Sequence, residues 1–326
     1  MTRALITGIA GQDGSYLTEL LLAKGYDVYG LIEPGAPREV PFVAPSERLH
    51  LLEGDLRDLD SIVAALDESR PDELYNLAAI SFVGDSWEQA EAITDVNAVG
   101  VLRLLEAIRR AGLDVRFCQA SSGQMLDTAE APQRETTCIR PQSPYAAAKA
   151  YAYFISVNHR ESYGMYVANA ILFNHESPRR PPHFVTRKIT RAAAQIKLGL
   201  AEELRLGNLD AVRDWGFAGD YVEAMWLMLQ QERPGDFVLA SGEAHTVRDF
   251  CAAAFGHLGL DWERYVVVDE QLLRPSEAGV MIGDMSLARE VLGWSPHVAF
   301  PQLVQMMVDE DIRILQDEVD AHSERL

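Results

Sequence analysis

The 326-residue chain is poor in cysteine and in basic residues, and it has no long apolar run. Its cysteines, Cys118, Cys138 and Cys251, are too irregularly spaced for a disulfide framework or a zinc site, so we expect reduced thiols and no bound metal. With 29 lysines and arginines against 49 aspartates and glutamates, the net charge of −20 argues against nucleic acids and anionic membranes as partners. No apolar segment approaches the length of a membrane span, and no signal region precedes the first predicted strand. We therefore expect a cytoplasmic protein that binds neither nucleic acid nor membrane.

What the chain does contain is a glycine-rich loop near its start. Residues 3–8 have the pattern of a short buried strand and residues 14–24 that of a helix, with Gly8, Gly11 and Gly14 between them. Glycines at this G-x-x-G-x-x-G spacing allow a tight turn, in which backbone N–H groups can approach a pyrophosphate at the helix N-terminus. The loop predicts a dinucleotide site; a strand–helix turn without a ligand is the alternative.

The second predicted strand, 27–32, ends at Glu33 and Pro34. A carboxylate at this place can accept hydrogen bonds from the adenosine ribose hydroxyls, and it repels a 2′-phosphate. No arginine follows before Arg38. The pattern favours NAD over NADP, with a merely solvated turn residue at Glu33 as the alternative.

Tyr145 and Lys149 are four residues apart and so share one face of a predicted helix. A lysine ammonium beside a phenol stabilises the phenolate, so we expect the pKa of Tyr145 to be lowered toward neutrality. Such a tyrosine can take the proton of an alcohol while the carbon gives up hydride to a dinucleotide. Ser121 and Ser122, about twenty residues upstream, strengthen the prediction of a redox site over that of a structural helix face.

Strand and helix patterns alternate through the first half of the chain. We expect strands at 3–8, 27–32, 49–53, 73–78, 115–120 and 166–173, and helices at 14–24, 58–69, 88–110 and 145–162. This alternation predicts an α/β fold built on a Rossmann-type, doubly wound parallel sheet.

The pattern changes at Asn174, where a proline-rich polar segment begins. Residues 246–257 and 301–318 are amphipathic helices by their spacing. We predict a dinucleotide-binding domain of residues 1–173, to which 208–232 returns, and a smaller substrate-binding α/β lobe of residues 174–326. Arginine clusters at 179–180 and around 187–191 are candidates for neutralising anionic ligands in an otherwise acidic protein.

Long segments of the chain resemble the GDP-mannose 4,6-dehydratases, extended short-chain dehydrogenases that act on nucleotide sugars. The resembling segments are 4–16, 75–79, 143–149, 171–180, 184–191, 206–210, 213–216 and 220–230. The resemblance implies cofactor contacts from Gly8, Gly11, Gln12, Asp13, Gly14, Asp55, Leu56, Leu77, Ala78, Ala79, Tyr145, Lys149, His175 and Arg180, to which we add Glu33. It implies substrate contacts from Ser81, Ser122, Asn174, Lys188, Leu206, Arg213, Arg274 and Glu277. The lysine and the arginines suit a diphosphate, and Glu277 can accept hydrogen bonds from ribose or a base.

One departure from the family bears on the reaction. Where the family reads Thr-Ser-Glu, this chain reads Ser122-Gly123-Gln124, so that Gln124 replaces the glutamate that removes the C5 proton before water is lost. An amide cannot act as that base near neutral pH. The remaining catalytic residues, Ser122, Tyr145 and Lys149, suffice for oxidation and reduction at C4. The sequence therefore predicts an NAD-dependent nucleotide-sugar 4-epimerase on a dehydratase-like scaffold.

Three alternatives stay open. The first is a dehydratase in which His175 or Glu176 acts as the base, the second is a 4-ketosugar reductase, and the third is a non-catalytic nucleotide sensor. The predicted helices 88–110 and 145–162 are expected to pair with their copies in a homodimer. Residues 35–43 do not resemble the loop that joins dimers into tetramers in the family, so we expect assembly to stop there.

Overall fold

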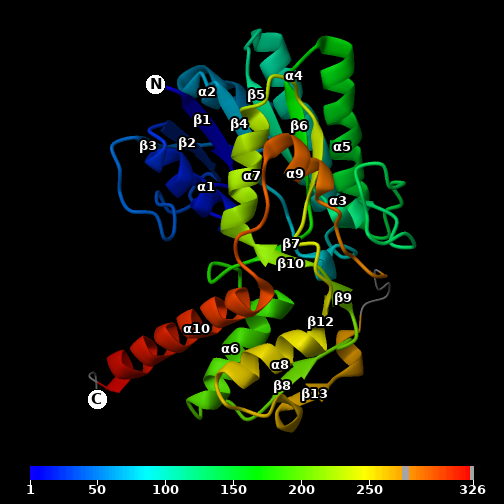
Figure 1. The fold of residues 1–326 in the computed structure, drawn as a ribbon. Helices are drawn as coiled ribbons and strands as arrows, with labels where there is room; N and C mark the ends of the chain where they lie inside the picture. The colour runs from blue at the N-terminus through cyan, green and yellow to red at the C-terminus, as the bar shows by residue number, and fades with distance from the viewer. Residues whose placement is uncertain (274–278, 324–326) are drawn as a thin grey trace.

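A computed structural model describes residues 1–273 and 279–323 of the chain (Figure 1). Its centre is a seven-stranded sheet with the order β11-β6-β5-β4-β1-β2-β3, in which every neighbouring pair is parallel. The strands are β1 (Arg3–Thr7), β2 (Asp27–Ile32), β3 (Leu49–Glu53), β4 (Glu73–Asn76), β5 (Arg116–Ser122), β6 (Val167–Leu172) and β11 (Asp236–Leu239). The strand order reverses between β1 and β4, as in a doubly wound Rossmann sheet, and the predicted fold class is confirmed.

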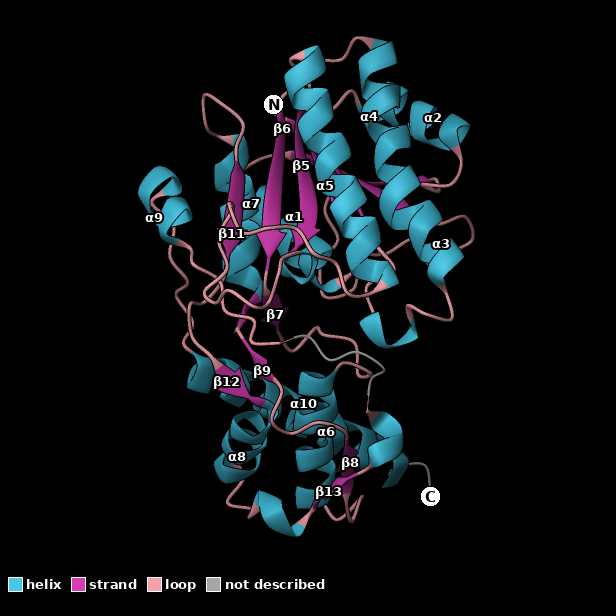
Figure 2. Cartoon of the chain, turned by 90° about the vertical axis from the view of Figure 1, so that its right-hand side faces the viewer, coloured by secondary structure: helices cyan, strands magenta, loops and turns pink. Residues whose placement is uncertain are grey.

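Helices cover both faces of this sheet. One face carries α1 (Gln12–Ala23), α7 (Ala218–Leu229) and α9 (Ser286–Leu292). The other carries α2 (Leu59–Ser69), α4 (Gly100–Ala111) and α5 (Pro144–Tyr163), which stand in front of the strands in Figure 2. Parallel strands buried on both sides need apolar residues at nearly every position, and β1, β4 and β6 are accordingly buried along almost their whole length.

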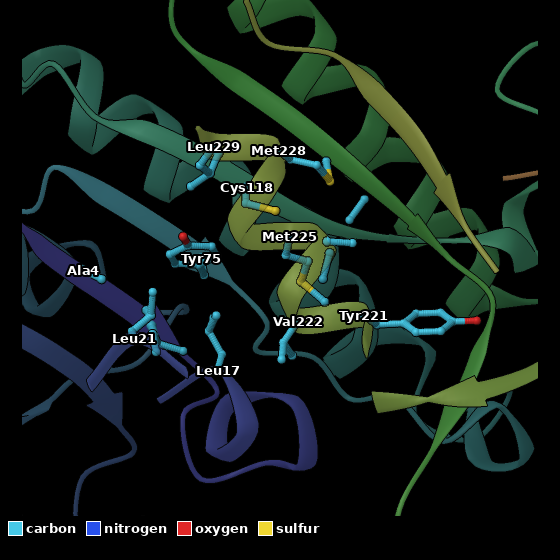
Figure 3. Packing of buried hydrophobic residues seen from close by; sticks show 14 of the residues in the cluster. Ala4, Leu17, Leu21, Tyr75, Cys118, Tyr221, Val222, Met225, Met228 and Leu229 are labelled. Atoms are coloured by element: carbon cyan, nitrogen blue, oxygen red, sulfur yellow. The ribbon is translucent and has the colours of Figure 1, made fainter. Parts of the chain in front are cut away.

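The hydrophobic core on the α1 side explains why α1 and α7 form and pack against the sheet. Leu17 and Leu21 are one helical turn apart on α1, and Val222 and Met225 have the corresponding spacing on α7. Figure 3 shows these side chains between the helices and the strand that carries Tyr75. Burying each large aliphatic side chain contributes about 1.5–3 kcal/mol before the cost in conformational entropy, so this layer holds the glycine loop at the start of α1 firmly against the sheet.

The smaller lobe lies below the sheet in Figure 1. It contains α6 (Val185–Lys197), α8 (Val247–His257) and α10 (Phe300–Ser323), together with short strand pairs formed by β8 (Leu204–Leu206) with β13 (Val266–Val268) and β9 (Val212–Arg213) with β12 (His245–Thr246). Its core is built around Trp215, Phe250 and Phe300. At the junction, β7 (Asn174–Glu176) pairs with β10 (Trp215–Phe217).

The remaining elements are short. They are η1 (Val83–Asp85), α3 (Ala90–Thr94), η2 (Asp95–Val99), η3 (Gly123–Met125), η4 (Trp262–Arg264) and η5 (Glu270–Leu272). Over residues 1–273 and 279–323, no helix is long and apolar enough to cross a membrane.

Two boundaries differ from the sequence predictions. The predicted helix 88–110 begins at Ala90 and contains η2, a turn of π-helix, in which buried Asn97 bonds both the backbone N and O of Ile80 at 2.9 Å. The return of the chain to the sheet continues beyond 232, since β11 pairs with β6 and α9 packs beside it. The dinucleotide-binding domain is therefore made of several separate segments of the chain, and residue 173 does not divide the sequence into two domains.

Candidate active site

A cavity of about 720 Å³ lies where the sheet meets the smaller lobe. Its sheet wall, as we call it, contains residues at the carboxyl ends of β1, β4, β5 and β6, among them Gly8, Leu77, Ser122 and Phe173. Its lobe wall contains Lys188, Leu206, Arg213, Val247 and Leu272. Ligands of doubly wound folds bind at this edge, where the strand order reverses.

The glycine loop on the sheet wall fits a dinucleotide pyrophosphate. Gly8 has φ +69°, and a Cβ atom there would lie 2.8 Å from the backbone N of Ala78. A Cβ atom on Gly14 would lie 2.4 Å from the carbonyl O of Gly8, so neither position accepts a side chain. Among the described residues, no side chain caps α1 at Gly11, which leaves its first-turn amides to face a phosphate. Gln12 also lines the cavity.

Ser122, Tyr145 and Lys149 come together on the sheet wall. Ser122 ends β5, where its Oγ accepts from the backbone N of Gln124 at 3.2 Å, and it hydrogen-bonds the phenol of Tyr145. Lys149, one turn along α5, has its Nζ 5.8 Å from the centroid of the Tyr145 ring and donates to the carbonyl of Ala120 at 2.8 Å. A phenol, a hydroxyl and an ammonium thus meet beside the glycine loop, as proton transfer at a carbinol requires.

The pKa values of this group differ from the sequence prediction. Burial raises the pKa of Tyr145 above its usual value, although the hydrogen bond from Ser122 and the charge of Arg180 lower it in part. Burial also lowers the pKa of Lys149, to about 8. The expectation that Lys149 brings the phenol toward neutrality is wrong in this structure, because desolvation of so deeply buried a phenol outweighs the neighbouring positive charge.

Gln124 lines the cavity in the short helix η3, directly after Ser122. The preceding residue, Gly123, is pressed against the ring of buried Phe173, where an added Cβ would lie 2.9 Å from Cε2. That Gln124 takes the place of the family's glutamate stays a prediction; its amide can donate or accept a hydrogen bond but cannot take a proton from carbon.

The two alternative bases, His175 and Glu176, are both engaged. Nε2 of His175 lies 2.8 Å from Oδ2 of Asp13, and its Nδ1 lies 2.7 Å from the carbonyl two residues earlier. Burial lowers the pKa of His175, but the charge and hydrogen bond of Asp13 raise it overall. Glu176 accepts from Thr186 Oγ1 at 2.6 Å and lies 3.1 Å from Nε of Arg180. Both side chains line the cavity, and a role for either as the base stays a prediction.

The predicted clusters of positive charge reach the cavity only in part. Arg180 and Lys188 line it. The other three arginines are paired with carboxylates of α1 and α10, in the pairs Arg179–Glu19, Arg187–Asp311 and Arg191–Glu318. They hold the structural elements together, because their guanidinium groups point to those helices.

Several predicted substrate residues form or border the lobe wall. Ser81, Asn174, Lys188, Leu206 and Arg213 all line the cavity. Burial lowers the pKa of Lys188, while buried Arg213 donates from Nη1 to the carbonyl of the preceding residue at 2.7 Å. The predicted Arg274 and Glu277 lie outside the described residues.

The sequence prediction missed an aromatic group in the lining of the cavity, formed by Phe82, His183 and Phe184. The ring of Phe82 packs edge to face on the other two, with centroids 4.9 Å from His183 and 5.5 Å from Phe184. The available signal was the clustering of aromatic residues just after a strand and just before a helix. Asn208 and Gln271 on the lobe wall were missed as well.

Three predicted cofactor residues lie away from the cavity lining, at the ends of β2 and β3. Glu33 is exposed, and Leu56 is buried beneath α4. The carboxylate of Asp55 accepts from Nε of Arg57 at 2.9 and 3.0 Å, and this bonding lowers its pKa. These ends of parallel strands are where the adenosine of a dinucleotide would lie, and the three contacts stay predictions.

The fold and the site together define an enzyme of the short-chain dehydrogenase/reductase superfamily, with its tyrosine and lysine beside a dinucleotide loop. The chain belongs to the GDP-mannose 4,6-dehydratase family, whose model, described as GDP-mannose 4,6 dehydratase, matches residues 5–307.

Individual relatives agree. The chain is 52% identical to GDP-mannose 4,6 dehydratase 1 of Arabidopsis thaliana over 97% of its length and 91% of the relative's. It is 46% identical to GDP-mannose 4,6 dehydratase of Homo sapiens, over 96% and 92% of the two chains. Among solved structures, the UDP-glucose 4-epimerase of Thermus thermophilus in complex with NAD is 29% identical, with a TM-score of 0.82 over 95% of this chain and 99% of that one.

Proposed function

We propose that this enzyme oxidises C4 of a nucleotide-linked hexose with bound NAD, and that GDP-mannose or a close relative of it is the substrate. The observation that carries the proposal is the meeting of Ser122, Tyr145 and Lys149 beside the glycine loop in one cavity. The names of the dehydratase relatives support a guanosine diphosphate sugar, and the NAD of the Thermus relative, with Glu33 at the end of β2, supports NAD.

The chain's own residues have separate tasks in this reaction. When bound, NAD supplies the hydride acceptor for C4. Tyr145 accepts the O4 proton, Ser122 holds the sugar hydroxyl and the phenol in register, and Lys149 offers positive charge to the phenolate that results. Lys188 and Arg213 on the lobe wall are placed to bind the diphosphate.

The fate of the 4-keto sugar depends on Gln124. Elimination of water from C6 needs a base at C5, and among the described residues of the cavity the carboxylates of Asp13 and Glu176 are both engaged, by His175 and Arg180. Without such a base the keto sugar persists until hydride returns, and return to the opposite face inverts C4. We therefore infer a nucleotide-sugar 4-epimerase as the first candidate.

The second candidate is GDP-mannose 4,6-dehydration, and the comparisons favour it over the first. Relatives up to 52% identical carry that name, and the family model matches nearly the whole chain. Under this alternative, a side chain other than Gln124 removes the C5 proton.

Reaction of GDP-mannose in deuterated water separates the two candidates. We expect an epimeric product without deuterium at C5, measured by proton NMR. A 6-deoxy-4-keto product with deuterium at C5 would establish the dehydratase instead. Absence of any turnover with a panel of nucleotide sugars would remove both.

Restoring the missing carboxylate sharpens this test. We expect Gln124→Glu to introduce deuterium at C5, because the new carboxylate takes the position of the family's base. Gln124→Asn is the control, since it keeps an amide, and it should leave C5 unlabelled.

We further propose a cytoplasmic homodimer formed through α5. Tyr151 and Phe154 are 43% and 56% exposed and, three residues apart, lie on one face of that helix. A monomer in light scattering at micromolar concentration would contradict this assembly.

A further inference from the structure

A buried ion pair in the smaller lobe joins the C-terminal helix to the wall of the cavity. Arg187 on α6 and Asp311 on α10 have 8% and 0% of their side chains exposed. Nε of Arg187 donates to both carboxylate oxygens of Asp311, at 2.8 and 2.9 Å, and Thr190 Oγ1 donates to the same carboxylate at 2.7 Å. The carboxylate is thus fully bonded, as its removal from water requires.

The rest of the Arg187 guanidinium is directed at a loop. Nη1 donates to the carbonyl of Pro178 and, at 3.1 Å, to that of Arg180. The loop 177–184 runs from β7 to α6 and forms part of the cavity lining. Five donors in a planar fork allow one guanidinium to hold a carboxylate and two carbonyls at once, which an ammonium cannot do.

Arg180, whose carbonyl Arg187 binds, is a charged residue of the cavity lining. The guanidinium of Arg180 lies 3.7 Å above the Phe184 ring, and its Nε lies 3.1 Å from Glu176. Its side chain is 18% exposed and lines the cavity. Burial raises the pKa of Tyr145, and from this position the charge of Arg180 counteracts part of that rise.

We propose that Arg187, anchored by Asp311, is a positioning residue that fixes the 177–184 loop and so places the charge of Arg180 in the cavity that Tyr145 also lines. The C-terminal helix α10 thereby acts on the reaction although the pair itself lies outside the cavity lining. Tyr145 also faces Lys149 of its own helix, Ser122 of β5 and Asp13 of α1, none of which Arg187 contacts.

The test uses Arg187→Lys in the full-length protein. Lysine keeps the charge opposite Asp311 but cannot also reach both loop carbonyls. If the pair serves stability alone, amide exchange in 177–184 should be the same in this variant as in the wild type. If it positions the loop, amide hydrogen exchange measured by mass spectrometry should become at least about tenfold faster in 177–184, while exchange in α6 and α10 is retained.

A second arm measures the electrostatic consequence, and it rests on the proposed function. When the loop is released, the guanidinium of Arg180 is no longer held in place. The acidic limb of the kcat/KM profile should then move to higher pH by roughly half a unit, since the Tyr145 phenol becomes harder to ionise. Arg180→Gln should give the same displacement, and combining it with Arg187→Lys should add nothing further.

The matched control is the Arg191–Glu318 pair, which joins the same two helices at 3.6 Å without touching the loop. Arg191→Lys should change neither the exchange of 177–184 nor the pH profile. Should Arg187→Lys fail to fold, the double variant Arg187→Met/Asp311→Leu removes both charges together and takes its place. Unchanged exchange in 177–184 in a folded variant overturns the proposal; absence of turnover in the wild type overturns only the proposed function, because the exchange arm needs no substrate.

Discussion

The two walls of the cavity are built in different ways. The sheet wall comes from short local motifs, in which a loop or a helical turn supplies neighbouring residues such as Gly8 with Gly11 and Tyr145 with Lys149. The lobe wall is assembled from segments far apart in the sequence, including Lys188, Leu206 and Leu272. Under the proposed function, the sheet wall carries the redox chemistry and the lobe wall selects the nucleotide sugar. Substitutions on the first should affect turnover, and substitutions on the second should affect binding.

The largest expected effect is that of Tyr145→Phe on the sheet wall. The variant should lose turnover by roughly a hundredfold or more, since the group that accepts the O4 proton is gone. NAD affinity, measured by calorimetry, should stay near that of the wild type. Activity within a few-fold of the wild type would take the proton transfer away from this residue.

Lys149→Met tests the same wall through stability. Burial lowers the Lys149 pKa from 10.5 to about 8, so below pH 8 the folded protein holds a charge at a cost on the order of 3 kcal/mol. The variant should therefore have a higher free energy of unfolding at pH 7, by up to that amount, while losing activity. The advantage should shrink from pH 8 to 10.5, where the wild type sheds the proton on folding and gains stability.

Urea denaturation at pH 7 and pH 9.5 checks this expectation. Lys197→Met is the control, because Lys197 is exposed and donates to the carbonyl of Leu258 at the surface. An equal difference between wild type and Lys149→Met at both pH values would mean that Lys149 is not held at a lowered pKa.

On the lobe wall, Lys188→Met should raise the KM for the nucleotide sugar by about tenfold, the effect of losing one charge-assisted hydrogen bond to a phosphate. The kcat should change little, because the lysine is remote from Tyr145 in this scheme. Lys24→Met, at a surface position where Lys24 stacks on Trp226, provides the comparison. A fall in kcat with unchanged KM would mean that Lys188 takes part in the chemical step, and would contradict the assignment of binding to the lobe wall.

The smallest expected effect concerns the cofactor. Replacing Glu33 and Pro34 by arginines should shift the ratio of NAD to NADP affinity by several-fold toward NADP, as a carboxylate that repels a 2′-phosphate is replaced by groups that bind it. The protein as isolated should carry NAD, identified by mass spectrometry of the released nucleotide. NADP in its place would mean that Arg57, which the fold brings near Glu33, governs the choice.

The contrast between the walls also explains how far the sequence could be interpreted. The glycine loop and the Tyr145–Lys149 pair were predictable because each lies within a few consecutive residues, where sequence spacing alone determines which residues are neighbours. The bonds of His175 to Asp13 and of Arg187 to Asp311 join residues 162 and 124 positions apart, which no local pattern reveals. The pKa of Tyr145 was mispredicted because desolvation depends on how much of the chain covers the phenol.

The close contact between Gly123 and the ring of Phe173 has a consequence for redesign of this site. A serine at position 123 would bring its Cβ to 2.9 Å from Cε2 of the buried Phe173 ring. A glutamate at position 124 can be introduced alone, whereas a serine at 123 needs a change that moves the ring. An engineer who wishes to build Thr-Ser-Glu at positions 122–124 should therefore vary position 173 together with 123.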